Sequence, residues 1–116
     1  MARETLGRDR IIRSRTEIRD TLQKGKAVRT EFFTLRYRLG DGPPGVAFLA
    51  GKKVGKAVRR NRARRVLREA FRTSQVQVRG VAALIFIATE RAATGDHGEV
   101  KRSVDAALRR ATDHAG

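Results

Sequence analysis

The stretch KKVGKAVRRNRARRVLREAFR, residues 52–72, contains ten basic residues and a single acid, Glu69. It therefore carries nine of the chain's fifteen net positive charges. Its apolar residues recur at helical spacing on one face, which predicts an amphipathic helix; they are Ala63, Val66, Leu67, Ala70 and Phe71. Because so dense a positive charge repels itself, the opposite face predicts a polyanionic partner.

Two arginines at the start of this helix break the pattern. Arg59 and Arg60 project toward the apolar side, where a charge is not buried without a partner. We therefore expect the first turn to overhang the core and to lie at the edge of a groove. The other interpretation is a solvated basic helix without a specific partner, but solvated faces usually mix positive and negative charges.

The run GKKVGKAVRRNRARRVLREAFR, residues 51–72, resembles the signature of the bacterial ribonuclease P protein subunit. In that family a string KK-x-G-x-AV-x-RNR-x-(K/R)R-x-x-R-(E/Q)-x-F follows a strand and forms the RNA-binding helix. A weaker resemblance extends over about residues 9–112. Carried over by position, it implies that the RNA-contacting residues are Lys52, Lys53, Arg59, Arg60, Asn61, Arg62, Arg64, Arg65, Arg68 and Arg72.

The resemblance also implies a function. Ribonuclease P is a ribonucleoprotein endonuclease that removes 5′ leaders from precursor tRNA; its RNA is the catalyst, with bound magnesium ions, and its protein assists. The implied partners are ribonuclease P RNA and precursor tRNA, with no small-molecule substrate and no cofactor bound by the protein alone. Asn61 is informative within the motif because an amide pairs directionally with RNA, although a local hydrogen bond at the helix start also explains it.

Family members hold the leader in a groove between the first helix and the sheet. This chain has Ile18 and Leu22 where relatives usually carry aromatic residues, and Arg36 where another aromatic residue is common. Aliphatic side chains contact a base face without aromatic stacking, and both residues are equally explained as core. An arginine at position 36 would face the groove, where it could stack on a base or meet a phosphate.

Composition limits the possible classes of protein. A chain of 116 residues with 40% hydrophobic residues fits one domain with one modest core. A net charge of +15 and a pI near 11.7 point to nucleic acid or an anionic membrane surface. There is no cysteine, which excludes disulfides and cysteine-based metal sites. No apolar run is long enough to cross a membrane and the N-terminal stretch lacks the apolar core of a secretory signal, so we expect a cytoplasmic protein.

The rest of the chain predicts a two-layer α+β sandwich, a small mixed sheet packed with helices. Local patterns indicate a helix at 15–24 capped by Ser14 and Glu17, with room for a short strand at 26–30. They indicate a strand at 31–39 and a turn at 41–45 that forms a hairpin into a strand at 46–50. A buried strand at 81–88 and a helix from Asp96 follow. We expect a flexible basic arm at 1–13, the domain at 14–112 and a frayed tail at 113–116. The resemblance further implies a left-handed β-α-β crossover like that of ribosomal protein S5 domain 2.

No protein active site is evident in the sequence. The twelve acids are scattered, and neither histidine has an evident nucleophilic partner. Asp96, His97 and Glu99 could bind a metal, but helix capping explains Asp96 and Glu99 without one. We therefore expect catalytic residues to be absent, and the chain to be the accessory subunit of an enzyme whose RNA is catalytic.

Other classes of function compete with this interpretation. A structural RNA-binding protein of ribosomal type would share the basic sandwich, but it would not stimulate precursor-tRNA cleavage. A membrane-active cationic protein is disfavoured because the apolar face of the basic helix has two alanines, one Phe and no Trp. A DNA-binding helix-turn-helix is disfavoured because predicted strands flank the basic helix.

Overall fold

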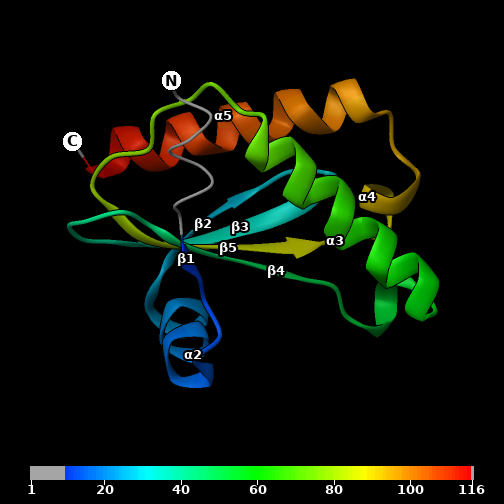
Figure 1. Cartoon of the computed structure of the whole chain (residues 1–116), viewed down its shortest axis with the longest axis horizontal. Helices are drawn as coiled ribbons and strands as arrows, with labels where there is room; N and C mark the ends of the chain where they lie inside the picture. Colours follow the sequence, from blue (N-terminus) through cyan, green and yellow to red (C-terminus); the bar gives the residue numbers. More distant parts are fainter. Residues whose placement is uncertain (1–9, 116) are drawn as a thin grey trace.

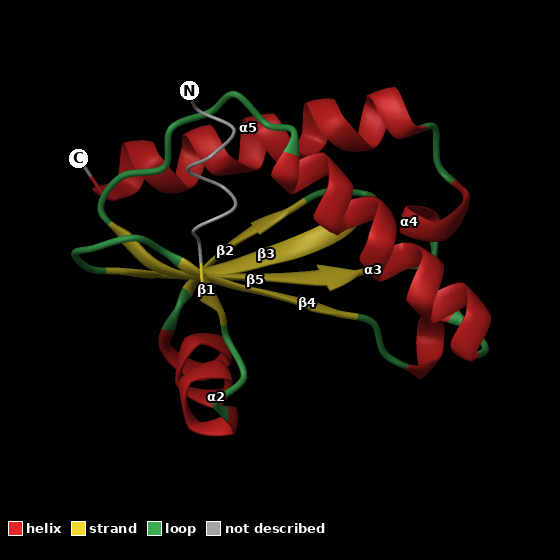
Figure 2. Ribbon diagram, viewed as in Figure 1, coloured by secondary structure: helices red, strands yellow, loops and turns green. Residues whose placement is uncertain are grey.

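A computed structural model describes residues 10–115, leaving aside the side chain of Arg10. It is an α+β structure in which a mixed sheet carries helices on both faces (Figures 1 and 2). The elements in chain order are β1 (Arg10–Ile11), α2 (Arg15–Lys24), β2 (Lys26–Arg29), β3 (Phe33–Leu39), β4 (Gly45–Leu49), the 3₁₀ turn η1 (Lys52–Val54), α3 (Ala57–Arg72), β5 (Val81–Ala88), α4 (Arg91–Thr94) and α5 (His97–Ala115).

The strands are arranged in the order β1-β4-β5-β3-β2. β5 pairs in parallel with β4 and antiparallel with β3, and α3 makes the crossover between the two parallel strands. The predicted hairpin from residues 31–39 into 46–50 is therefore wrong, because β5 lies between β3 and β4. The predicted β-α-β unit and the short strand near 26–30 are confirmed, whereas the left-handed sense of the crossover stays a prediction of the resemblance.

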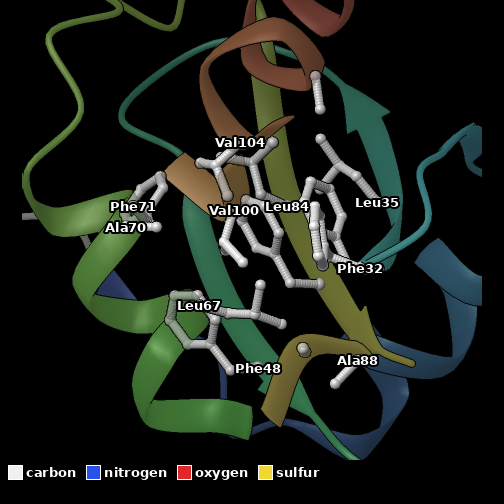
Figure 3. Packing of buried hydrophobic residues seen from close by; sticks show 14 of the residues in the cluster. Phe32, Leu35, Phe48, Leu67, Ala70, Phe71, Leu84, Ala88, Val100 and Val104 are labelled. Carbon is white, nitrogen blue, oxygen red and sulfur yellow. The ribbon is translucent and has the colours of Figure 1, made fainter. Parts of the chain in front are cut away.

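The main core lies between the sheet and the pair α3 and α5, as Figure 3 shows. Phe86 of β5 is fully buried at its centre. Its ring centroid lies 5.3 Å from that of Phe33, 5.4 Å from that of Phe48 and 5.8 Å from that of Phe71. Offset and edge contacts of this kind add to the free energy gained by burying the rings. This aromatic cluster ties α3 to the middle of the sheet.

A second, smaller cluster occupies the other face of the sheet under α2. Its buried residues are Ile12, Ala47, Ala83 and Ile85, and the partly buried residues packed on it are Ile18, Leu22, Leu49 and Ile87. Alternate residues of β5 thus contribute to the two clusters. The prediction of a central strand buried on both faces is confirmed.

The predicted beginnings of α2 and α5 are confirmed by their N-terminal caps. Ser14 Oγ accepts a hydrogen bond of 3.3 Å from the Glu17 amide, and Asp96 Oδ2 accepts one of 3.0 Å from the Glu99 amide. Gly25 ends α2 with extended backbone rather than a left-handed turn. A side chain is excluded there because a Cβ would lie 2.6 Å from the carbonyl oxygen of Tyr37.

Three other expectations from the sequence need correction. Residues 1–9 of the predicted arm lie outside the described residues, but Arg10–Ile11 pair with β4 and Ile12 is buried under α2. α5 continues to Ala115, because His114 stacks on Tyr37 with ring centroids 5.8 Å apart, so residues 113–115 form no tail. The strand predicted at 31–39 begins only at Phe33, and Phe32 before it turns into the same core.

Candidate nucleic-acid interface

Helix α3 combines a short buried stripe with a long exposed beginning. Its buried residues are Ala63, Leu67, Ala70 and Phe71, so none lies in the first turn and a half. Val58 in that part of the helix is 77% exposed. Figure 2 shows the N-terminal end of α3 reaching beyond the ends of β4 and β5. The overhang expected from Arg59 and Arg60 is confirmed.

The ten residues assigned to RNA contact lie on the surface of this helix and of η1. Arg60 and Arg64 are half-buried and the other eight are exposed; these are Lys52, Lys53, Arg59, Asn61, Arg62, Arg65, Arg68 and Arg72. Gly55 separates η1 from the helix with φ of +132°, a backbone conformation that side chains rarely adopt. The structure therefore places the candidate residues next to one another along η1 and α3, and this set of solvent-facing residues is here called the α3 face.

Several members of the α3 face are held by short contacts along the helix. The Arg64 guanidinium donates to Asn61 Oδ1, which is the local hydrogen bond considered for Asn61 from the sequence. The amide NH₂ group of Asn61 remains as its donor toward a partner. The Arg68 guanidinium lies 5.8 Å from the Phe48 ring centroid, within the range of a cation–π contact.

Glu69 is the acid within the α3 face. Arg72 donates from Nε to Glu69 Oε1 at 3.3 Å and from Nη2 to Glu69 Oε2. These hydrogen bonds lower the pKa of the Glu69 carboxyl and raise the pKa of the Arg72 guanidinium. The side chains of Arg59, Arg62 and Arg65, by contrast, make no ion pair or hydrogen bond with any residue that the structure describes.

An open hollow lies between the start of α3 and α4, an element that the sequence analysis missed. Its volume is about 510 Å³, and Arg59 and Arg62 line it together with Val58, Ala93 and Thr94. Helix α4, which lines one side of the hollow, has four residues. A helix of this length is too short to show a periodic pattern, so the sequence did not predict it. The hollow confirms that the first turns of α3 lie at the edge of a depression.

The predicted leader groove corresponds to the α2 side of the sheet. Ile18 and Leu22 are half-buried and pack on the small cluster under α2, which confirms the core role considered for them, whereas contact with a leader stays a prediction. Leu49 of β4 and Ile87 of β5 are also partly buried there. The sequence analysis missed these two residues, although the alternation along each strand places them on this face.

Arg36 lies differently from the expectation. It was expected to face the groove, but its guanidinium lies under the C-terminal end of α2 and donates to the carbonyl oxygen of Leu22 and, at 3.1 Å, to that of Gly25. Its Nε is buried and has no hydrogen-bond partner among the described residues. Arg38, two residues further along β3, donates to Glu17 Oε2 at 3.2 Å. Both arginines thus attach α2 to the sheet.

The acids and histidines of the described residues are used in other ways. No group of three His, Asp or Glu side chains between residues 10 and 115 lies close enough to hold a metal ion. Asp96 caps α5, and Glu17 is paired with Arg38. Within the same residues, no helix is both long and apolar enough to cross a membrane.

Comparison with known proteins assigns the family. The family model for ribonuclease P matches residues 6–112. The chain belongs to the ribonuclease P protein family. The ribonuclease P protein component of Desulfovibrio desulfuricans is 34% identical over 98% of this chain and 92% of that protein. The corresponding component from Thermoanaerobacter is 29% identical over 90% of this chain and 91% of that protein.

Solved structures of the family share the fold. The ribonuclease P protein from Thermotoga maritima superimposes with a TM-score of 0.72 at 26% identity, covering 89% of this chain and 97% of that one. The Staphylococcus aureus protein gives a TM-score of 0.71 at 23% identity, covering 86% of this chain and 93% of that one. The α+β fold predicted from the sequence is therefore confirmed, and the chain is a subunit of ribonuclease P.

Proposed function

We propose that this chain binds ribonuclease P RNA through the α3 face and holds the 5′ leader of precursor tRNA between α2 and the sheet. In this way it assists endonucleolytic removal of the leader. The observation that carries the proposal is the α3 face itself, in which Arg59, Arg62 and Arg65 have no partner among the described residues. Cations left free on an overhanging helix are suited to phosphate groups.

The protein's contribution to this reaction is binding and positioning. Each phosphate that an arginine of the α3 face neutralises releases counterions, which favours association with a long RNA. Among the described residues no three Asp, Glu or His side chains converge to form a magnesium site, and Asp96 and Glu17 are already used in a helix cap and an ion pair. We therefore expect the catalytic magnesium ions to be held by the RNA subunit, which carries the chemistry. A role in tRNA processing places the protein in the cytoplasm.

The leader would meet a different surface. Ile18, Leu22, Leu49 and Ile87 offer a partly exposed apolar floor on which bases can lie flat. Arg15 and Arg19 of α2 are exposed beside it and can meet phosphates. Because the floor is aliphatic, it selects single-stranded character rather than sequence.

Cleavage of a precursor tRNA by a bacterial ribonuclease P RNA at low magnesium tests the proposal. We expect cleavage at the mature 5′ end to be stimulated by the protein, and no cleavage by the protein alone. Tight RNA binding without stimulation would replace this function with that of a structural RNA-binding protein. Cleavage by the protein alone would contradict the assignment of chemistry to the RNA.

A second comparison tests the leader surface by itself. The protein should increase the affinity of the holoenzyme for a precursor with a leader of several nucleotides more than for the same tRNA without a leader. An equal increase for both would remove the leader from the proposal while leaving the RNA-binding role in place.

A further inference from the structure

A pocket lies between α3 and α5, on the flank of the α3 face. Its volume is about 240 Å³. Val66 and Ala70 form its floor, and both pack against the main core. Glu69 and Thr73 of α3 face His97 and Lys101 of α5 across its rim, beside Arg65. We call this the interhelix pocket.

The floor of the interhelix pocket does not suit a phosphate group. Val66 is half-buried and Ala70 is 7% exposed, so an occupant would contact methyl groups and aliphatic stems. A charged oxygen gains nothing from such a surface and loses its water. The volume is below the roughly 300 Å³ at which pockets begin to hold drug-sized ligands, so one planar ring system is a suitable occupant.

The rim of the interhelix pocket supplies a hydrogen-bond acceptor, the carboxylate of Glu69. The carboxylate of Glu69 is an acceptor only, and both of its oxygens accept from Arg72 in an exposed pair, which a ligand that donates to the same two oxygens would replace. Hydrogen bonding from Arg72 lowers the pKa of the Glu69 carboxyl, which favours its ionised, acceptor-only form. Thr73 Oγ1 already donates to the Glu69 backbone carbonyl at 2.9 Å, and Lys101 lies 3.7 Å from Asp105. A ligand with N–H donors on its edge therefore complements Glu69.

We propose that the interhelix pocket receives one unstacked nucleobase of the bound RNA, with the amino edge of the base toward Glu69. The phosphates on either side of that base would meet Arg65 and Lys101. RNA-binding proteins commonly recognise extruded bases in this way, through a flat apolar contact and hydrogen bonds to the base edge. The inference rests on the proposed RNA binding and adds a base-specific contact to it. It also gives Glu69 a role within a surface that otherwise attracts phosphate.

Guanine is the base that fits this rim best. Its N1–H and N2–H₂ groups lie side by side and can donate together to one carboxylate, whereas uracil offers a single N–H on that edge. The test uses the full chain labelled with ¹⁵N and titrated with GMP, UMP and ribose 5-phosphate, followed by amide NMR shifts. We expect GMP to shift the amides of Val66, Ala70 and Thr73 on one wall and of His97 and Lys101 on the other. Ribose 5-phosphate should leave the floor residues unshifted.

Paired variants sharpen the test. Glu69→Gln should weaken GMP binding about fivefold, the lower end of what a carboxylate contributes to base discrimination, and should change UMP binding less. The matched control is Glu90→Gln, which removes an equally exposed acid outside the pocket. Equal shifts with ribose 5-phosphate and GMP, or equal effects of the two variants, would overturn the base site.

The same preparations separate this inference from the proposed function. The parent chain is also titrated with ribonuclease P RNA. If it binds the RNA but shows no base-dependent shifts at the pocket, the inference fails and the proposed function stands. If it binds no ribonuclease P RNA, the proposed function fails, and with it the premise of the pocket proposal.

Discussion

Arginines are used differently at the two helices that lie on opposite faces of the sheet. On one face, α3 carries Arg59, Arg62 and Arg65, whose side chains make no ion pair or hydrogen bond with the residues that the structure describes. On the other face, Arg36 and Arg38 of β3 are committed to α2, one to its last carbonyl oxygens and one to Glu17. In the first case the arginine side chains are free for the proposed RNA partner, and in the second case they stabilise the fold.

The difference follows from what each helix buries. α3 is attached by Leu67 and Phe71, which reach the aromatic cluster around Phe86, so it needs no charged contact to stay in place. α2 offers only Ile18, Leu22 and the small Thr21 to a minor cluster. Contacts from the two β3 arginines therefore add to a weak apolar attachment. Position along the chain does not distinguish these roles, but burial of the neighbouring residues does.

The largest expected effect is a loss of stability, which we compare at two adjacent residues of β5 that lie on opposite faces of the sheet. Phe86→Ala should lower the free energy of unfolding by about 3–5 kcal/mol, because it empties the centre of the main core. Ile85→Ala, equally buried but on the α2 face, should cost about 2 kcal/mol, the lower end for such a change, because its cluster is small. Urea unfolding monitored by circular dichroism measures both. A larger loss at Ile85 would reverse the ranking of the two faces.

The next effect concerns the attachment of α2. Arg36→Met keeps much of the side-chain length but leaves the carbonyls of Leu22 and Gly25 without their donor, so it should cost about 1–2 kcal/mol of stability. Arg38→Met is the matched control and should cost at most about 0.5 kcal/mol, because its ion pair with Glu17 is partly exposed. Hydrogen exchange of the α2 amides should rise more in the first variant. Equal exchange in both would show that Arg36 does not hold the helix.

A smaller effect on stability, with a large effect on binding, is expected for α3. Arg62→Ala should weaken binding to ribonuclease P RNA several-fold and change the free energy of unfolding by less than about 0.5 kcal/mol, since the side chain is exposed and unpaired among the described residues. Filter binding and thermal unfolding measure the two effects. Unchanged RNA affinity, or a large drop in the thermal midpoint, would contradict the role given to the α3 face.

The smallest effect is a pH dependence at the end of α5. Burial raises the pKa of Tyr37 above 10, and nearby Arg110 opposes this shift only in part. The folded state therefore keeps the phenol proton when the unfolded chain releases it, so stability should decline as the pH rises above 10. Tyr37 is the single tyrosine of the chain, and phenolate absorbance reports it alone. A titration midpoint at or below 10 would contradict the burial of this hydroxyl.

Local signals made much of the fold predictable. Each of these signals is formed by residues that are close in the sequence. Examples are the capping box at Ser14, the apolar stripe from Ala63 to Phe71 and the continuous apolar run of β5. Such patterns need no knowledge of the rest of the chain. The basic composition of the α3 face could also be recognised from the sequence, and all ten predicted residues are exposed or half-buried on η1 and α3.

The remaining features depend on contacts between distant residues. The turn at 41–45 gave the expected signal, but whether it joins paired strands depends on β5, which follows in the sequence and inserts between them. The resemblance placed Arg36 on the groove side of the sheet, but no sequence pattern could show that its guanidinium reaches Leu22 and Gly25. Ile12 looked like part of an arm because its partner Ala47 lies far along the chain.

The salt dependence of binding to ribonuclease P RNA, without precursor tRNA, tests the contrast between the two uses of arginine most directly. The slope of log affinity against log salt concentration reports how many phosphates the protein neutralises. Arg65→Ala should reduce that slope by about one unit, whereas Arg38→Met should leave it unchanged. Equal reductions in both variants, or none in Arg65→Ala, would contradict the assignment of RNA binding to the α3 face.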